Sequence, residues 1–315
     1  MNWLNEALER TPQETKDERP ETPHEKGRLS FATRPLLGDG GMGTMLIDAG
    51  LPLGTSPELW NVERPGIVEG IQRQYVEAGA QFVTANTFGA SPLALARHGL
   101  VDRCAELNAA AVELARKAGA ERVLGDLGPS GRFLEPYGDL TVAELRHSYK
   151  EQVRALREAG ADGIIVETMS DPVELSFAVR VARDISDWPV LATFAFQKAG
   201  DRFRTMMGAT VVEAFKAAID AGADAAGANC GTGLSFDDYR ELAAELVEAS
   251  NGFPVILQPN AGAPREADGS FVYDATPAEF AAWGVDAAAQ GVKIVGGCCG
   301  TTPAHIRALA EALRG

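Results

Sequence analysis

The chain has 315 residues, of which 45% are hydrophobic, and it carries a formal net charge of -15. This size allows one large α/β domain or two ordinary ones, each with a full core. The acidic balance excludes binding to nucleic acid or to an anionic membrane through a general positive field. Neither an apolar run of about 18 residues nor a signal-peptide pattern is present, so we expect a soluble, cytoplasmic protein.

Residues 1–30 form a polar segment rich in Glu, Lys, Thr and Pro, with at most a short helix around Leu4 to Leu8. This composition buries too little apolar surface to order itself. We therefore expect a disordered polar tail over residues 1–30 and a single domain over residues 31–315. A linker and a docking segment are equal alternatives for the tail.

From Pro35 onward, short apolar runs alternate with amphipathic stretches of helical length. Ala-Gly-Ala sequences precede several of these runs, and glycine there permits the left-handed conformation that ends a helix. The repetition predicts parallel strands in an α/β fold, a (β/α)8 TIM barrel, with an open doubly wound sheet as the alternative. The predicted strands cover residues 36–38, 82–84, 123–125, 163–166, 190–194, 225–228, 255–257 and 292–295, and the clearest predicted helices cover 142–157, 209–221, 236–249 and 277–290.

In a (β/α)8 barrel the chemistry lies at the C-terminal ends of the strands. Polar residues follow seven of the eight predicted strands, so we expect them to meet at one rim. The fourth cysteine of the chain, Cys104, lies in a predicted helix and is interpreted as a packing or surface residue. The rim residues are Asp39, Asn86, Thr87, Asp126, Glu167, Asn229, Cys230, Gln258, Asn260, Cys298 and Cys299.

Three of the four cysteines belong to this rim, each among glycines: Cys230 in Gly-Ala-Asn-Cys-Gly, and Cys298 and Cys299 in Gly-Gly-Cys-Cys-Gly-Thr-Thr-Pro. Clustered thiols in a reducing compartment indicate metal ligands or catalytic groups rather than a disulfide framework. Three thiolates leave a tetrahedral zinc with one open position, as in a catalytic site. A vicinal disulfide, three unrelated thiols, and a structural site with a fourth ligand are the alternatives.

Zinc bound by three thiolates is electron-rich and activates water poorly. It is suited to binding a fourth thiol, which loses its proton and becomes a nucleophile at neutral pH. This chemistry predicts alkylation of a thiol. Two alternative functions from other classes of protein remain, a non-catalytic zinc module and a redox relay of cysteines.

Five motifs resemble the homocysteine S-methyltransferase family, which includes the homocysteine-binding module of cobalamin-dependent methionine synthase and the betaine–homocysteine and S-methylmethionine enzymes. The resemblance covers residues 34–314 and implies a (β/α)8 barrel, a zinc held by Cys230, Cys298 and Cys299, and homocysteine as the thiol that becomes methionine. The motifs are Gly-Asp-Gly-Gly-Met-Gly-Thr at 38–44, Asn-Thr-Phe at 86–88, Glu-Thr at 167–168, Gly-Ala-Asn-Cys-Gly at 227–231 and Gly-Gly-Cys-Cys-Gly-Thr-Thr-Pro at 296–303.

The same resemblance implies roles for residues that bind homocysteine. Asp39 and Glu167 match the acidic residues that hold the amino group. A turn aspartate and a carboxylate paired with arginine are their alternatives. The other substrate-side candidates are the backbone N–H groups of Gly40 and Gly41, which would face the carboxylate, and Thr87 and Asn229, which are equally readable as residues that fix loops.

Asn260 matches an asparagine that can take the fourth zinc position when the thiol is absent. For the methyl donor we favour a methylcorrinoid supplied by a separate protein, with betaine or S-methylmethionine as the alternative. Trp60, in Ser-Pro-Glu-Leu-Trp-Asn, would cover a cationic donor on this second reading, or is an ordinary packing residue. The sequence leaves open the donor, the oligomeric state, the role of the tail and any preference for selenohomocysteine.

Overall fold

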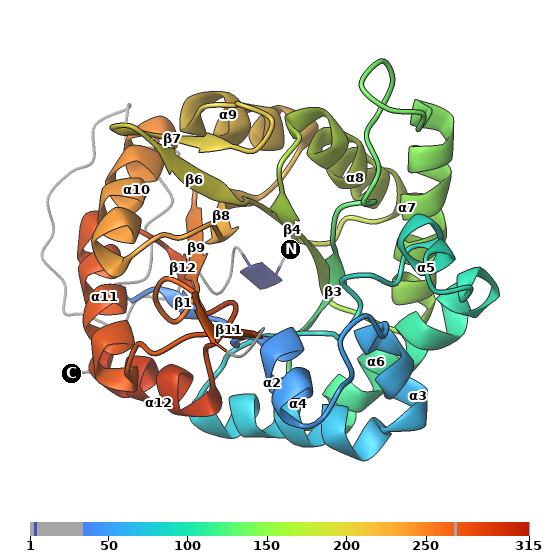
Figure 1. The fold of residues 1–315 in the computed structure, drawn as a ribbon, viewed down its shortest axis with the longest axis horizontal. Helices are drawn as coiled ribbons and strands as arrows, with labels where there is room; N and C mark the ends of the chain where they lie inside the picture. The colour runs from blue at the N-terminus through green and yellow to red at the C-terminus, as the bar shows by residue number, and fades with distance from the viewer. Residues whose placement is uncertain (1–2, 5–33, 268–269, 315) are drawn as a thin grey trace, which may run out of the picture.

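The computed structural model describes residues 3–4, 34–267 and 270–314. Eight parallel strands form one sheet in the order β1-β12-β9-β8-β5-β4-β3-β2, and helices surround it (Figure 1). The strands are β1 (Leu36–Leu37), β2 (Val83–Thr84), β3 (Val123–Leu127), β4 (Gly163–Met169), β5 (Val190–Phe194), β8 (Ala225–Cys230), β9 (Val255–Pro259) and β12 (Ile294–Val295). The helices are α2 (Met42–Asp48), α3 (Trp60–Glu63), α4 (Pro65–Ala78), α5 (Pro92–Ala96), α6 (Cys104–Lys117), α7 (Val142–Glu158), α8 (Pro172–Ile185), α9 (Val211–Ala221), α10 (Phe236–Ala249), α11 (Pro277–Gln290) and α12 (Pro303–Ala312), with 3-10 turns η1 (Pro57–Leu59) and η2 (Val101–Arg103).

The first and last strands of this order meet through Gln81, just before β2. Its backbone N–H donates to the Leu37 carbonyl at 2.8 Å, and its side-chain oxygen accepts from the Leu37 N–H at 2.9 Å. The ring of strands is therefore closed, which confirms the predicted (β/α)8 barrel over the open sheet.

All eight predicted strands are present, and the predicted helices at 236–249 and 277–290 have the predicted bounds. The sequence pattern missed two antiparallel hairpins on the rim: β6 (Phe196–Ala199) with β7 (Arg202–Thr205), and β10 (Arg265–Ala267) with β11 (Ser270–Val272). Both hairpins extend βα loops beyond the barrel, so they shape the surface above the strand ends.

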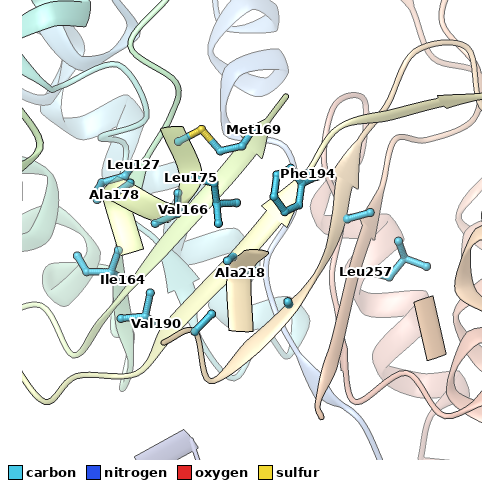
Figure 2. Close-up of a cluster of buried hydrophobic side chains, with 14 of the residues drawn as sticks. Leu127, Ile164, Val166, Met169, Leu175, Ala178, Val190, Phe194, Ala218 and Leu257 are labelled. Atoms are coloured by element: carbon cyan, nitrogen blue, oxygen red, sulfur yellow. The ribbon is translucent and has the colours of Figure 1, made fainter. Parts of the chain in front are cut away.

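The core has two layers because strands of a barrel are buried on both faces. Between sheet and helices, Val166 of β4 lies beside Leu175 of α8 in a cluster of buried aliphatic side chains (Figure 2). Inside the barrel, seven strands and the residue just before β2, Phe82, each contribute one side chain to a buried ring: Leu36, Phe82, Leu124, Ile165, Leu191, Ala225, Ile256 and Ile294.

The N-terminal mouth of the barrel is filled by Leu4, which is fully buried and packs against this inner ring. The short segment of residues 3–4 lies in the middle of the ring of strands in Figure 1. Next to Leu4, the Trp3 indole donates to the Asp162 carbonyl at 3.0 Å. The prediction of an appendage over residues 1–30 is therefore wrong for these two residues, because Leu4 contacts a complete apolar ring. The rest of the predicted tail lies outside the described residues.

Leu4→Ala should lower the free energy of unfolding by about 2–4 kcal/mol, since it removes a buried side chain without a replacement. The matched control is Ile47→Ala on α2, where the side chain is exposed and the expected loss is below about 0.5 kcal/mol. Urea unfolding measures both. Equal losses in the two variants would show that Leu4 contributes nothing to the core in solution.

Candidate metal and substrate site

A cavity of about 420 Å³ opens at the C-terminal ends of the strands. One wall is formed by the three rim cysteines: Cys230 ends β8, and Cys298 and Cys299 lie in the turn after β12. The opposite wall carries the carboxylates of Asp39, which follows β1, and of Asp126 and Glu167, which lie in the C-terminal halves of β3 and β4. The lining residues used below are Asp39, Gly40, Gly41, Glu58, Phe88, Asp126, Glu167, Thr168, Cys230, Cys298 and Cys299.

The thiols of Cys230, Cys298 and Cys299 converge as predicted. The Cys299 sulfur lies 3.9 Å from that of Cys298 and 4.0 Å from that of Cys230, and all three lie within 4.8 Å of one another. A tetrahedral zinc with Zn–S bonds of about 2.3 Å separates its sulfurs by about 3.8 Å. The spacing and chemistry of these ligands therefore fit a zinc ion.

Irregular backbone makes this convergence possible. Successive side chains on a regular strand point to opposite faces, which would separate Cys298 from Cys299. Here β12 ends at Val295, and Gly300 has a left-handed φ of +76°. Cys230 itself has a φ of +53°, an uncommon conformation outside glycine, which turns the chain at the end of β8.

The three thiols differ in how readily they ionise. Hydrogen bonds from Cys298 and Cys299 lower the pKa of Cys230 to about 3. The pKa of Cys299 is raised to about 12 and that of Cys298 is also raised, first of all through the hydrogen bonds to Cys230. The cluster thus holds one thiolate readily and resists further ionisation, unless a cation offsets the added negative charge.

On the opposite wall, burial raises the pKa of Asp39 to about 7, although Thr84 donates to it through both its N–H, at 2.7 Å, and its hydroxyl, at 3.1 Å. Burial, with the nearby Cys230 and Asp39, raises the pKa of Glu167 to about 8. A positive group placed between these carboxylates would favour their ionised forms. This wall is suited to an ammonium group.

Several predicted residues lie elsewhere. The Thr87 hydroxyl donates to the Asp126 carbonyl at 3.0 Å and accepts from the Asp126 N–H at 2.9 Å, so Thr87 fixes a loop and does not line the cavity. The Gly41 N–H donates to the Thr301 hydroxyl at 2.9 Å, so it already has a hydrogen-bond partner other than a substrate carboxylate. Trp60 is packed in the outer core and does not line the cavity, which favours the alternative of an ordinary packing residue. Gly40 does line the cavity.

Asn260 and Asn229 are buried beside the thiols. The Asn260 amide donates to the Gly231 carbonyl at 3.2 Å and helps to lower the pKa of Cys230, and the Asn260 side-chain oxygen has no partner among the described residues. This position is compatible with the predicted fourth ligand, which stays a prediction. The Asn229 amide lies 3.7 Å from the Cys298 sulfur and 3.2 Å from a Glu167 oxygen.

The sequence analysis assigned no role to three further residues at this site. Asp126 was recognised only as a strand-end residue, but it is buried in the cavity wall, and one carboxylate oxygen has no partner in the described structure. Glu58 is also buried, and it accepts from Ser56 and from the Gly89 N–H, both at 2.6 Å. Tyr273 packs against Gly300, next to Cys299, and burial together with the nearby Cys299 raises its pKa. Tyr273 directly follows β11, in a hairpin that the sequence pattern missed, so the rule of barrel strand ends did not point to it.

A closed barrel with three converging thiols and a carboxylate wall at one rim defines a (β/α)8 barrel with a candidate metal site. The model of the homocysteine S-methyltransferase family matches residues 36–313, and the chain belongs to this family. The chain is 35% identical to methionine synthase of Mycobacterium tuberculosis and 33% identical to that of Mycobacterium leprae, over 90% of its own length in both cases. It spans about a quarter of the length of these relatives.

Among solved structures, the metallated homocysteine methyltransferase MmuM from Escherichia coli has the same fold. The TM-score is 0.72 at 24% sequence identity, over 88% of this chain and 96% of that one. Among the helices that the structure describes, none is long and apolar enough to cross a membrane.

Proposed function

We propose that this chain is a zinc-dependent homocysteine S-methyltransferase that produces methionine. The observation that carries the proposal is one cavity with two chemically different walls, a thiol triad spaced for zinc and a set of buried carboxylates. Homocysteine has the matching ends, a thiol and an ammonium group. The family to which the chain belongs supports this substrate, and the names of the two mycobacterial relatives support methionine as the product.

In this proposal Cys230, Cys298 and Cys299 hold the zinc, which when bound supplies a position where a thiol loses its proton at neutral pH. Asp39 and Glu167 bind the substrate ammonium, and Asp126 adds a third carboxylate to their wall. The homocysteine sulfur then attacks the methyl carbon of the donor, and the bond from that carbon to the leaving group breaks. The protein orients the sulfur and needs no general-base histidine.

The proposed donor is a methylcorrinoid carried by a separate protein. Betaine or S-methylmethionine is the second candidate, because Phe88 lines the cavity and is 38% exposed. An aromatic face in that position can attract a methylated ammonium or sulfonium group. A zinc- and homocysteine-binding module without turnover is the remaining alternative.

Methionine formation tests this proposal. The zinc-loaded protein is incubated with homocysteine and with methylcobalamin, betaine or S-methylmethionine in separate reactions. We expect turnover with methylcobalamin, at a low rate because the free cofactor lacks its carrier protein. Turnover with betaine or S-methylmethionine alone would replace the corrinoid donor. Binding of zinc and homocysteine without turnover, even with a corrinoid protein present, would favour the binding module, and a zinc-free protein with a reducible disulfide would favour a redox relay.

A further inference from the structure

Asn229 is the last residue before Cys230 on β8, and its side chain is 1% exposed. It does not line the cavity, although sequence similarity suggested contact with the substrate. Instead its amide lies behind the cavity wall, between Glu167 on the carboxylate side and Cys298 on the thiol side.

The hydrogen-bond partners fix the orientation of this amide. Its oxygen accepts from the Thr168 backbone N–H and from the Thr193 hydroxyl, both at 2.7 Å. A backbone N–H can only donate, so the atom facing it must be the oxygen. The NH2 group is therefore directed at the Glu167 carboxylate at 3.2 Å, the Thr168 hydroxyl at 2.7 Å and the Cys298 sulfur at 3.7 Å.

The backbone around Asn229 is held in an uncommon conformation. Thr168, next to Glu167, has a φ of +59°, and Cys230, next to Asn229, has a φ of +53°. A β-branched residue in the left-handed region is an outlier that persists only when its surroundings determine it. Asn229 forms hydrogen bonds with both the N–H and the hydroxyl of Thr168. It therefore fixes the backbone next to Glu167, and with it the direction of the Glu167 side chain.

We propose that Asn229 is a positioning residue that orients the Glu167 carboxylate and the Cys298 sulfur together. One amide then governs both the recognition of the substrate ammonium and the retention of the metal. This inference rests on the proposed function, and it adds that the two walls of the site are coupled through a residue that touches neither substrate nor metal.

The test compares Asn229→Ala with the wild type in two binding measurements. Zinc affinity, from competition with a chelator, should fall about 10- to 100-fold, the usual effect of losing a group that hydrogen-bonds a metal ligand. The preference for homocysteine over 4-mercaptobutyrate, which lacks the amino group, should fall about tenfold, because a hydrogen bond to a charged carboxylate is lost. A general loss of structure would weaken the binding of both thiols equally and would leave their ratio unchanged.

Two other variants separate the effects. Glu167→Gln should lose the preference for homocysteine but keep its zinc affinity. Asn251→Ala, an exposed asparagine at the other end of the barrel, should change neither quantity. Zinc affinity and thiol preference within twofold of the wild type in Asn229→Ala would overturn the inference.

If Asn229→Ala does not fold, Thr193→Val replaces it. Valine keeps the shape of threonine and removes one of the two donors that orient the amide. The preference for homocysteine should then fall about threefold to tenfold, the effect of one ordinary hydrogen bond. An unchanged preference in this variant would contradict the inference.

A wild-type protein that binds neither zinc nor homocysteine would overturn the proposed function, and the inference with it.

Discussion

Cys298→Ala is expected to remove bound zinc and to reduce methionine formation to background. The variant leaves two thiols, and among the residues that the structure describes no other cysteine joins the cluster. With the metal lost, nothing in the site lowers the pKa of the homocysteine thiol, which is near 8.5 for a free thiol, so little thiolate forms at neutral pH. Metal analysis of the purified protein and the methionine assay measure the two losses.

Cys104→Ala is the matched control. Cys104 is also buried, but it lies on α6, where its thiol donates to the Ala90 carbonyl, and it belongs to a separate apolar cluster. Burial raises its pKa to about 11, so it stays a neutral thiol. This variant should keep zinc and activity with a modest loss of stability. Full activity in Cys298→Ala would contradict the proposed mechanism.

Asp39→Asn is expected to make the protein more stable above pH 7 while it weakens homocysteine binding. Asp39 is buried, and its pKa rises from 3.8 in the unfolded chain to about 7 in the folded protein. The folded state therefore binds more protons between these pH values, so the free energy of unfolding falls as pH rises through this window. The pKa rises by about three units, and at about 1.36 kcal/mol each this corresponds to about 4 kcal/mol of the free energy of unfolding, which is lost in full above pH 7.

Asparagine does not ionise, so the variant should lack this part of the pH dependence. Between pH 5 and pH 8 the titration window of Asp39 spans about two of the three units, so urea unfolding should give wild type and variant values that differ by about 3 kcal/mol more at pH 8 than at pH 5. Homocysteine binding should weaken about tenfold or more, since a charged partner of the ammonium is lost. Asp48→Asn, at an exposed position on α2, is the control. Identical pH dependence in wild type and Asp39→Asn would show that Asp39 ionises normally in the fold.

Much of this site was predictable because periodicity places strands, and a barrel brings strand ends together. Cys230, Cys298 and Cys299 could be grouped from their glycine-flanked positions at the ends of predicted strands. Asp39 and Glu167 follow from the same rule, since each stands directly after an apolar run and lines the cavity.

The features of the site and fold that the sequence could not predict depend on side-chain direction and on long-range contacts. Thr87 stands after the predicted strand, but its hydroxyl is bound to the Asp126 backbone, and the Trp60 side chain is packed in the core. Leu4 joins the inner core through contacts that no local pattern encodes, because the other residues of that buried cluster are far from it in the sequence. Tyr273 reaches Cys299 from a hairpin whose position above the rim is set by tertiary packing.

The measurement that tests the central claim most directly is X-ray absorption at the zinc edge, with and without homocysteine. The account predicts bound zinc with three sulfur neighbours in the free protein and four when homocysteine is added, all at about 2.3 Å. An unchanged set of neighbours on addition of homocysteine, or four sulfurs or none in its absence, would contradict the claim that this barrel activates a thiol at a three-cysteine zinc.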